Sequence, residues 1–153
     1  MSPRHVVFVC WGNICRSPMA ERVAEKWAAD AGLTDVVFTS AGTSAEESGH
    51  PIDDRARRLL ERRGYRARGH RAHRITPADV AGADLVACME PLHVSLLRRR
   101  FPDADNLALL TDFDPGHQGE SIDDPWYGPD EAFAVTLAAI ERAMPGLLNW
   151  LRA

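Results

Sequence analysis

The segment FVCWGNICRSP, residues 8–18, holds two of the chain's three cysteines, Cys10 and Cys15. It also holds Arg16, a Gly-Asn pair that suits a tight turn, and a Ser-Pro pair typical of a helix start. A thiol near a helix N-terminus and a guanidinium group loses its proton more readily than a free cysteine does. The N–H groups of such a turn, together with Arg16, would bind a tetrahedral anion. These residue types therefore predict attack by the Cys10 thiolate on a bound phosphate.

Each part of this segment also has an ordinary structural interpretation. A cysteine at the end of a strand is most often a core residue, and a Gly-Asn pair is most often a simple turn. The combination of cysteine, turn, arginine and Ser-Pro at fixed spacing is much rarer than its parts. A Walker-type nucleotide loop is not matched, because no Gly-Lys-Ser or Gly-Lys-Thr follows the glycine.

Short apolar runs alternate with helical patterns along the rest of the chain. Buried strands are expected at 5–10, 36–40, 85–89 and 107–110. Helices are expected at 17–32 with Ser17 as N-cap, at 53–65, 76–84 and 91–100, and from Pro129 to the C-terminus, where Pro145 should kink or break the last helix. Buried strands joined by helices imply parallel crossovers. We therefore predict an α/β fold, one domain over residues 1–153, with a four-stranded parallel sheet and helices on both faces.

Composition limits the classes of partner and compartment. The net charge of −4 argues against nucleic acid as a partner, and the apolar run near the N-terminus is too short for a membrane span or a signal peptide. Three cysteines in 153 residues do not form a disulfide scaffold. We expect a cytoplasmic monomer without membrane insertion, although export by an unusual route stays open. Nine arginines lie between Arg55 and Arg74, as a solvated face or as a basic face that attracts phosphorylated substrates.

The segment at 10–18 resembles the active-site loop of the low-molecular-weight protein tyrosine phosphatases, C-x-G-N-x-C-R-S-P. Further along, DDPWYG at 123–128 resembles the Asp-Pro-aromatic-aromatic-Gly segment that carries the general acid of that family. The segments TSAGT (39–43), GH (69–70) and VACM (86–89) match as well. The resemblance covers nearly the whole chain and implies the Rossmann-like phosphotyrosine protein phosphatase I fold, with no cofactor and no metal.

The resemblance also implies a role for each matched residue. Cys10 would be the nucleophile, Arg16 the phosphate clamp and Asp124 the general acid and base, acting on tyrosine-phosphorylated proteins or peptides. The expected phosphate-binding residues are Trp11, Gly12, Asn13, Ile14, Cys15, Arg16 and Ser17. The expected supports of the loop are Asn13, Ser17, Ser40 and His70, although a histidine in an arginine-rich stretch is more often a surface residue.

The second loop cysteine has two candidate roles. In the family it can form a reversible disulfide with the nucleophile under peroxide, which halts further oxidation. By this resemblance Cys10 and Cys15 would form the redox pair. Alternatively, Cys15 only packs behind the loop. Cys88 lies on an expected buried strand and is interpreted as a core residue.

The rim of the expected pocket departs from the family pattern. Trp11 stands where a small or aliphatic residue is usual, and Glu46 stands where the family usually has an aromatic residue. The acid segment carries Trp126 and Tyr127 instead of two tyrosines. We expect Trp11, Glu46, Trp126 and Tyr127 to form the pocket walls, with Trp11 replacing the missing aromatic. The alternative places Trp11 in the core beneath the loop.

Other functions remain as alternatives. Arginine phosphatases share the loop but carry threonine before its second cysteine, where this chain has Ile14. Thioredoxin-linked arsenate reductases need two further cysteines late in the chain, and only Cys88 is present. A non-catalytic, redox-sensing phosphate-binding module is disfavoured by the presence of Cys10, Arg16 and Asp124 together.

Overall fold

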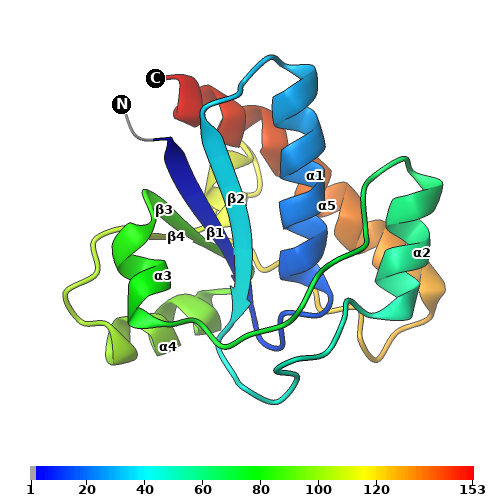
Figure 1. The fold of residues 1–153 in the computed structure, drawn as a ribbon, viewed down its shortest axis with the longest axis horizontal. Coiled ribbons are helices and arrows are strands. Elements are labelled where there is room, and N and C mark those ends of the chain that lie inside the picture. Colours follow the sequence, from blue (N-terminus) through cyan, green and yellow to red (C-terminus); the bar gives the residue numbers. More distant parts are fainter. Residues whose placement is uncertain (1–2) are drawn as a thin grey trace.

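Four parallel strands form the centre of the molecule (Figure 1). The computed structural model describes residues 3–153. The strands are β1 (Arg4–Cys10), β2 (Val36–Gly42), β3 (Leu85–Cys88) and β4 (Leu107–Leu109), in the spatial order β2-β1-β3-β4. The predicted parallel sheet is confirmed, because each apolar run supplies one strand whose side chains are buried.

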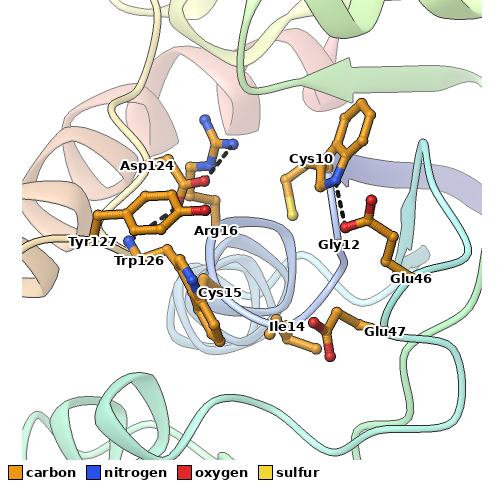
Figure 2. Close-up of a pocket in the computed structure, with 11 residues that line it drawn as sticks. Cys10, Gly12, Ile14, Cys15, Arg16, Glu46, Glu47, Asp124, Trp126 and Tyr127 are labelled. Carbon is orange, nitrogen blue, oxygen red and sulfur yellow. Dashed lines mark hydrogen bonds and ion pairs between the residues drawn. The ribbon is translucent and has the colours of Figure 1, made fainter.

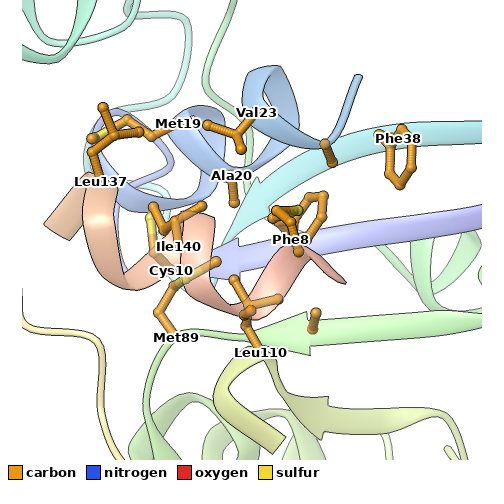
Figure 3. Packing of buried hydrophobic residues seen from close by; sticks show 14 of the residues in the cluster. Phe8, Cys10, Met19, Ala20, Val23, Phe38, Met89, Leu110, Leu137 and Ile140 are labelled. Atoms are coloured by element: carbon orange, nitrogen blue, oxygen red, sulfur yellow. The ribbon is translucent and has the colours of Figure 1, made fainter. Parts of the chain in front are cut away.

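Alternate residues of β1 point to opposite faces of the sheet, as the two-residue period of a strand requires. Val6, Phe8 and Cys10 belong to one buried cluster, and Val7 and Val9 belong to another. The first cluster packs against α1 (Arg16–Asp30) and α5 (Asp130–Arg152), and the second against α3 (Pro77–Gly82) and α4 (Pro91–Arg100). Figure 3 shows Phe8 between the sheet and these first two helices, near side chains from both. Helices therefore cover both faces, as predicted.

The remaining helices extend these layers. α2 (Asp54–Arg62) packs beside α1 and α5, and buries the apolar face predicted for it: Ala56, Leu59 and Leu60. A short 3-10 helix, η1 (Leu110–Phe113), continues β4 and packs against α5; the sequence patterns did not predict it. None of the helices in residues 3–153 is long and apolar enough to cross a membrane.

Two details expected of the helices are wrong, namely Ser17 as the N-cap of α1 and a break of α5 at Pro145. α1 begins at Arg16 with Cys15 in the N-cap position, so Ser17 is not the cap; its hydroxyl binds other partners, described below. α5 runs without a break through Pro145. Pro145 lies on the solvent side of α5, where water can hydrate the carbonyl that the missing N–H leaves unpaired.

The strand order determines where a ligand would bind. The chain leaves β1 toward β2 on one side and later returns to place β3 on the other side. Ligands of open α/β sheets bind at the carboxyl ends of the strands where such a reversal occurs. The segment that follows Cys10 lies at this point.

Candidate active site

The loop that joins β1 to α1 turns its carbonyl oxygens away from its own centre. Four of these oxygens accept hydrogen bonds from groups outside the loop. The Cys10 and Trp11 carbonyls accept from Thr43 N (2.9 Å) and Ser44 N (3.0 Å). The Asn13 carbonyl accepts from the His70 ring, and the Ile14 carbonyl accepts from Asp53 N (2.9 Å). In a trans peptide the next residue's N–H points opposite to the carbonyl. Within residues 3–153, no protein group accepts a hydrogen bond from the N–H groups of residues 11–16. The N–H groups that follow the four outward carbonyls, those of Trp11, Gly12, Ile14 and Cys15, therefore point toward the hollow that the loop surrounds and form an anion-binding nest.

Asn13 holds this loop in its unusual conformation. Its φ of 59° is the only left-handed φ of a non-glycine residue in the described chain. Its side-chain Nδ2 donates to Ser17 Oγ (2.9 Å) and Ser40 Oγ (3.0 Å), and its Oδ1 accepts from His73 N (3.1 Å). These buried bonds offset the cost of the left-handed conformation. Gly12, which precedes it, does not adopt the left-handed conformation.

A glycine on the next strand lets the loop lie close to the sheet. A Cβ on Gly42 would lie 2.8 Å from the Trp11 carbonyl oxygen, closer than carbon and oxygen approach without a shift of the backbone. Ser44 N and Oγ both donate to that same oxygen. The glycine of the TSAGT segment therefore permits the loop to be fixed against the end of β2.

The thiol of Cys10 lies at the end of β1 and is almost fully buried. Its Sγ lies 3.0 Å from the hydroxyl oxygen of Ser17. Asn13 Nδ2 donates to that oxygen, so the hydroxyl hydrogen of Ser17 has two acceptors within reach, the sulfur and the Ala41 carbonyl oxygen at 3.4 Å. A hydrogen bond donated to sulfur favours its thiolate form.

The guanidinium group of Arg16 is buried beside the loop, with its side chain only 2% exposed. Its Nη1 donates to Glu90 Oε2 (2.6 Å) and to the Ile122 carbonyl (2.8 Å). Its Nη2 lies 3.6 Å from Asp124 Oδ2. A guanidinium has five N–H donors, so the edge formed by Nε and Nη2 retains the pair that fits two phosphate oxygens.

Asp124 reaches the same cavity from the segment between η1 and α5. Its Oδ1 accepts from Trp126 N (3.1 Å), and the backbone on either side of it is tied to helices. Thr136 Oγ1 donates to the Asp123 carbonyl (3.0 Å), and Arg55 Nη1 donates to the Trp126 carbonyl (3.1 Å). The carboxyl group is partly exposed and lies across the cavity from Cys10, as Figure 2 shows.

These groups surround a cavity of about 380 Å³. The four residues expected as pocket walls, Trp11, Glu46, Trp126 and Tyr127, all line it, and Glu47 lines it as well. Trp11 is 40% exposed, so the core position considered for it is excluded, and its Nε1 donates to Glu46 Oε2 (3.2 Å). Tyr127 is 95% exposed. The mouth of the cavity is therefore aromatic on the Asp124 side and mixed aromatic and acidic on the Cys10 side.

Two residues of the loop and its supports, Cys15 and His70, have shifted pKa values. Burial, with a smaller contribution from Asp53, raises the pKa of Cys15, which is a free, buried thiol like Cys10 and Cys88. Burial lowers the pKa of His70 despite the opposing effect of its hydrogen bond to the Asn13 carbonyl. A neutral His70 still donates that bond, because the Nε2–H tautomer suffices.

Sequence reasoning did not find Glu90 and His93. Glu90 is the N-cap of α4, two residues beyond the end of β3, and His93 lies buried on α4 with Nε2 3.5 Å from Glu90 Oε2. Burial, followed by the charge of Arg16, lowers the pKa of His93. A signal existed for Glu90, since β3 neighbours β1 and the carboxyl ends of parallel neighbours meet at one edge. Among the described residues, no three histidine, cysteine or carboxylate side chains gather as a metal site.

Comparison with known proteins bears on this arrangement. The family model described as low molecular weight phosphotyrosine protein phosphatase matches residues 5–153. The chain belongs to this family. It is 41% identical over 152 residues to low molecular weight protein-tyrosine phosphatase A of Mycobacterium bovis, covering 97% of this chain and 92% of that protein. Members of the family with these names are protein-tyrosine phosphatases, so this family member is a phosphatase enzyme.

Solved structures of the family share its fold. A protein tyrosine phosphatase from Entamoeba histolytica, crystallised with Hepes in its active site, superposes with a TM-score of 0.92 at 29% identity, covering 97% of both chains. The YwlE arginine phosphatase from Geobacillus stearothermophilus gives a TM-score of 0.86 at 32% identity, covering 98% of this chain and 94% of the other. The same fold is therefore found in proteins named as tyrosine phosphatases and in one named as an arginine phosphatase.

Proposed function

We propose that the enzyme hydrolyses phosphotyrosine through a cysteinyl-phosphate intermediate. The observation that carries this proposal is the cavity in which Cys10 Sγ and the Asp124 carboxyl face each other across the unpaired N–H groups of the loop. A phosphate seated on those N–H groups and on Arg16 would present its phosphorus to the sulfur. The equatorial oxygens would then be stabilised by donors that are already in position.

In the first step, Cys10 thiolate attacks phosphorus and the bond to the phenolic oxygen breaks. Asp124 gives its proton to that oxygen, so tyrosine leaves as a neutral phenol. In the second step, water attacks the phosphorus of the cysteinyl phosphate and gives a proton to Asp124. The sulfur–phosphorus bond breaks, and thiolate and inorganic phosphate are released.

The roles of the neighbouring residues follow from their contacts. Arg16 would hold two phosphate oxygens with the donors that Glu90 and Ile122 leave free. Ser17 would stabilise the thiolate, and Asn13, Ser40 and His70 would hold the loop in place. The substrate ring would lie between Trp11 on one side and Trp126 or Tyr127 on the other, where aromatic pairs contribute about 0.5–1.5 kcal/mol each.

Turnover of p-nitrophenyl phosphate by wild type and by Cys10→Ser tests the proposal. The serine variant should lose turnover yet still bind vanadate, because the N–H groups and Arg16 remain. Asp124→Asn should slow turnover by about 10²- to 10⁴-fold and remove one limb of the pH–rate profile. Sizeable turnover by Cys10→Ser would exclude Cys10 as nucleophile. Faster turnover of phosphoarginine than of phosphotyrosine peptides would assign the substrate to the other class.

A further inference from the structure

A second cavity, of about 520 Å³, lies on the other side of Trp11 from the active site. Trp11 lines both cavities, so a single side chain forms the boundary between them. The second cavity lies between the segment after β2 and the C-terminal part of α4. Three arginines line it: Arg74, Arg99 and Arg100. We call it the basic groove.

The charges of the basic groove are not compensated by the protein. Within residues 3–153, none of the three arginines forms an ion pair. Arg74 Nε donates to the Thr43 carbonyl (3.2 Å) and Arg100 Nη1 donates to the Ile75 carbonyl (2.6 Å). Neutral carbonyl oxygens therefore orient two of the guanidinium groups and leave their charges available. Burial and the nearby Arg74 lower the pKa of Arg100, which agrees with like charges lying close together.

This pattern differs from the other arginines near the active site. Arg16 pairs with Glu90 and Asp124, and Arg55, which binds the Trp126 carbonyl, pairs with Asp53. The whole chain is acidic, with a net charge of −4, so a general excess of positive charge does not explain the groove. An anionic group supplied from outside the chain would complete it.

We propose that the basic groove binds a carboxylate side chain of the substrate peptide, close in sequence to the phosphotyrosine. The inference rests on the proposed function and deepens it by giving the enzyme a preference for acidic peptides. With the phosphotyrosine in the first cavity, the peptide has to cross only the width of Trp11 to reach the second. An extended chain covers about 3.3–3.6 Å per residue, so the carboxylate belongs to one of the three nearest residues.

The test compares two phosphotyrosine peptides of equal length, one with glutamate and one with glutamine at the three positions on each side. For wild type, kcat/KM should be about 3- to 10-fold higher for the glutamate peptide, as expected for a few partly exposed charge pairs. High salt should reduce the ratio, because ions screen exposed pairs. Arg99→Glu should abolish or invert it. Arg99 is exposed, and its side chain forms no hydrogen bond with another residue of 3–153, so the variant should fold.

Arg98→Glu is the matched control. Arg98 precedes Arg99 on α4, is also exposed, and does not line the groove. Its substitution by glutamate changes the net charge by the same amount. It should keep the wild-type ratio. Equal ratios for the two peptides in wild type, or an equal effect of both substitutions, would overturn the proposal. Wild-type turnover of p-nitrophenyl phosphate tests the proposed function separately, since this substrate carries no peptide.

Discussion

Glu90 Oε2 lies 2.6 Å from Nη1 of Arg16, so the carboxylate at the N-cap of α4, just beyond β3, orients the guanidinium group at the end of the loop after β1. The pair is asymmetric, because Arg16 is buried while the Glu90 side chain is 29% exposed. A buried charge that loses its partner is destabilising. Glu90 is therefore a positioning residue for Arg16 in the proposed mechanism.

We predict that Glu90→Gln lowers the free energy of unfolding by about 1–3 kcal/mol, less than for a fully buried pair because water reaches Glu90. The ratio kcat/KM should fall about 10-fold, a loss of roughly 1.4 kcal/mol in transition-state stabilisation. Added phosphate should stabilise the variant more than wild type, because the dianion supplies the missing negative charge. Urea unfolding with and without phosphate measures both effects. Unfolding curves identical to those of wild type would refute the positioning role.

His93 should make stability depend on pH. Its folded-state pKa is lowered by burial, so the unfolded chain binds a proton that the folded protein does not. The contribution of His93 is fully present above its unfolded pKa of about 6.5 and is lost as pH falls below it, by up to about 1.4 kcal/mol per pH unit. Unfolding at pH 7.5, 6.5 and 5.5 should show a shallower slope for His93→Asn. Equal slopes in wild type and in His93→Asn would contradict the prediction.

Trp11 should act on substrate binding rather than on stability. Trp11→Ala removes one aromatic wall, so KM for a phosphotyrosine peptide should rise about 3- to 10-fold, the equivalent of one aromatic pair. A small alkyl phosphate should be affected much less, and Tm should stay nearly unchanged because the side chain is 40% exposed. Steady-state kinetics on both substrates and a thermal melt distinguish a role of Trp11 in substrate binding from a role in stability. A large fall in Tm with equal loss on both substrates would show a structural role instead.

Cys15 should protect the enzyme from irreversible oxidation. Burial raises the pKa of Cys15, so it stays a neutral thiol and reacts slowly with peroxide itself. Peroxide would oxidise Cys10 to a sulfenic acid, which condenses with the Cys15 thiol to give a disulfide and water. Activity of wild type should therefore return with dithiothreitol, and that of Cys15→Ser should not. Cys88→Ala should recover like wild type, whereas full recovery of Cys15→Ser would disprove protection.

The strands and most helices were predictable because their signals are local. The apolar runs gave each strand to within two residues, and Pro129 marked the start of α5 correctly. The start of α1 was misplaced because Ser17 has the residue type of a cap, while its hydroxyl is used by Cys10 and Asn13. Local preference is overridden wherever a tertiary partner competes for the same group.

The candidate site was predictable where one short segment carries the chemistry. Cys10 and Arg16 lie six residues apart, and the family resemblance of the segment at 123–128 assigns Asp124 to the same site. Glu90 and His93 have no such segment. An acidic residue followed by proline at the start of a helix is common on protein surfaces, and only the adjacency of β3 to β1 brings this one to Arg16.

Ile122 divides the long segment between η1 and α5 into two shorter ones. Its N–H donates to the Met89 carbonyl (2.8 Å), its own carbonyl accepts from Arg16, and its side chain is buried in the core. The entropy of closing a loop depends on the span between fixed points. Asp124 is therefore carried by the short span from 123 to 129, not by the whole segment. The proposed acid is held at a high effective concentration beside the phosphate site. Most of the conformational entropy that this positioning costs is lost when the chain folds, not at each turnover.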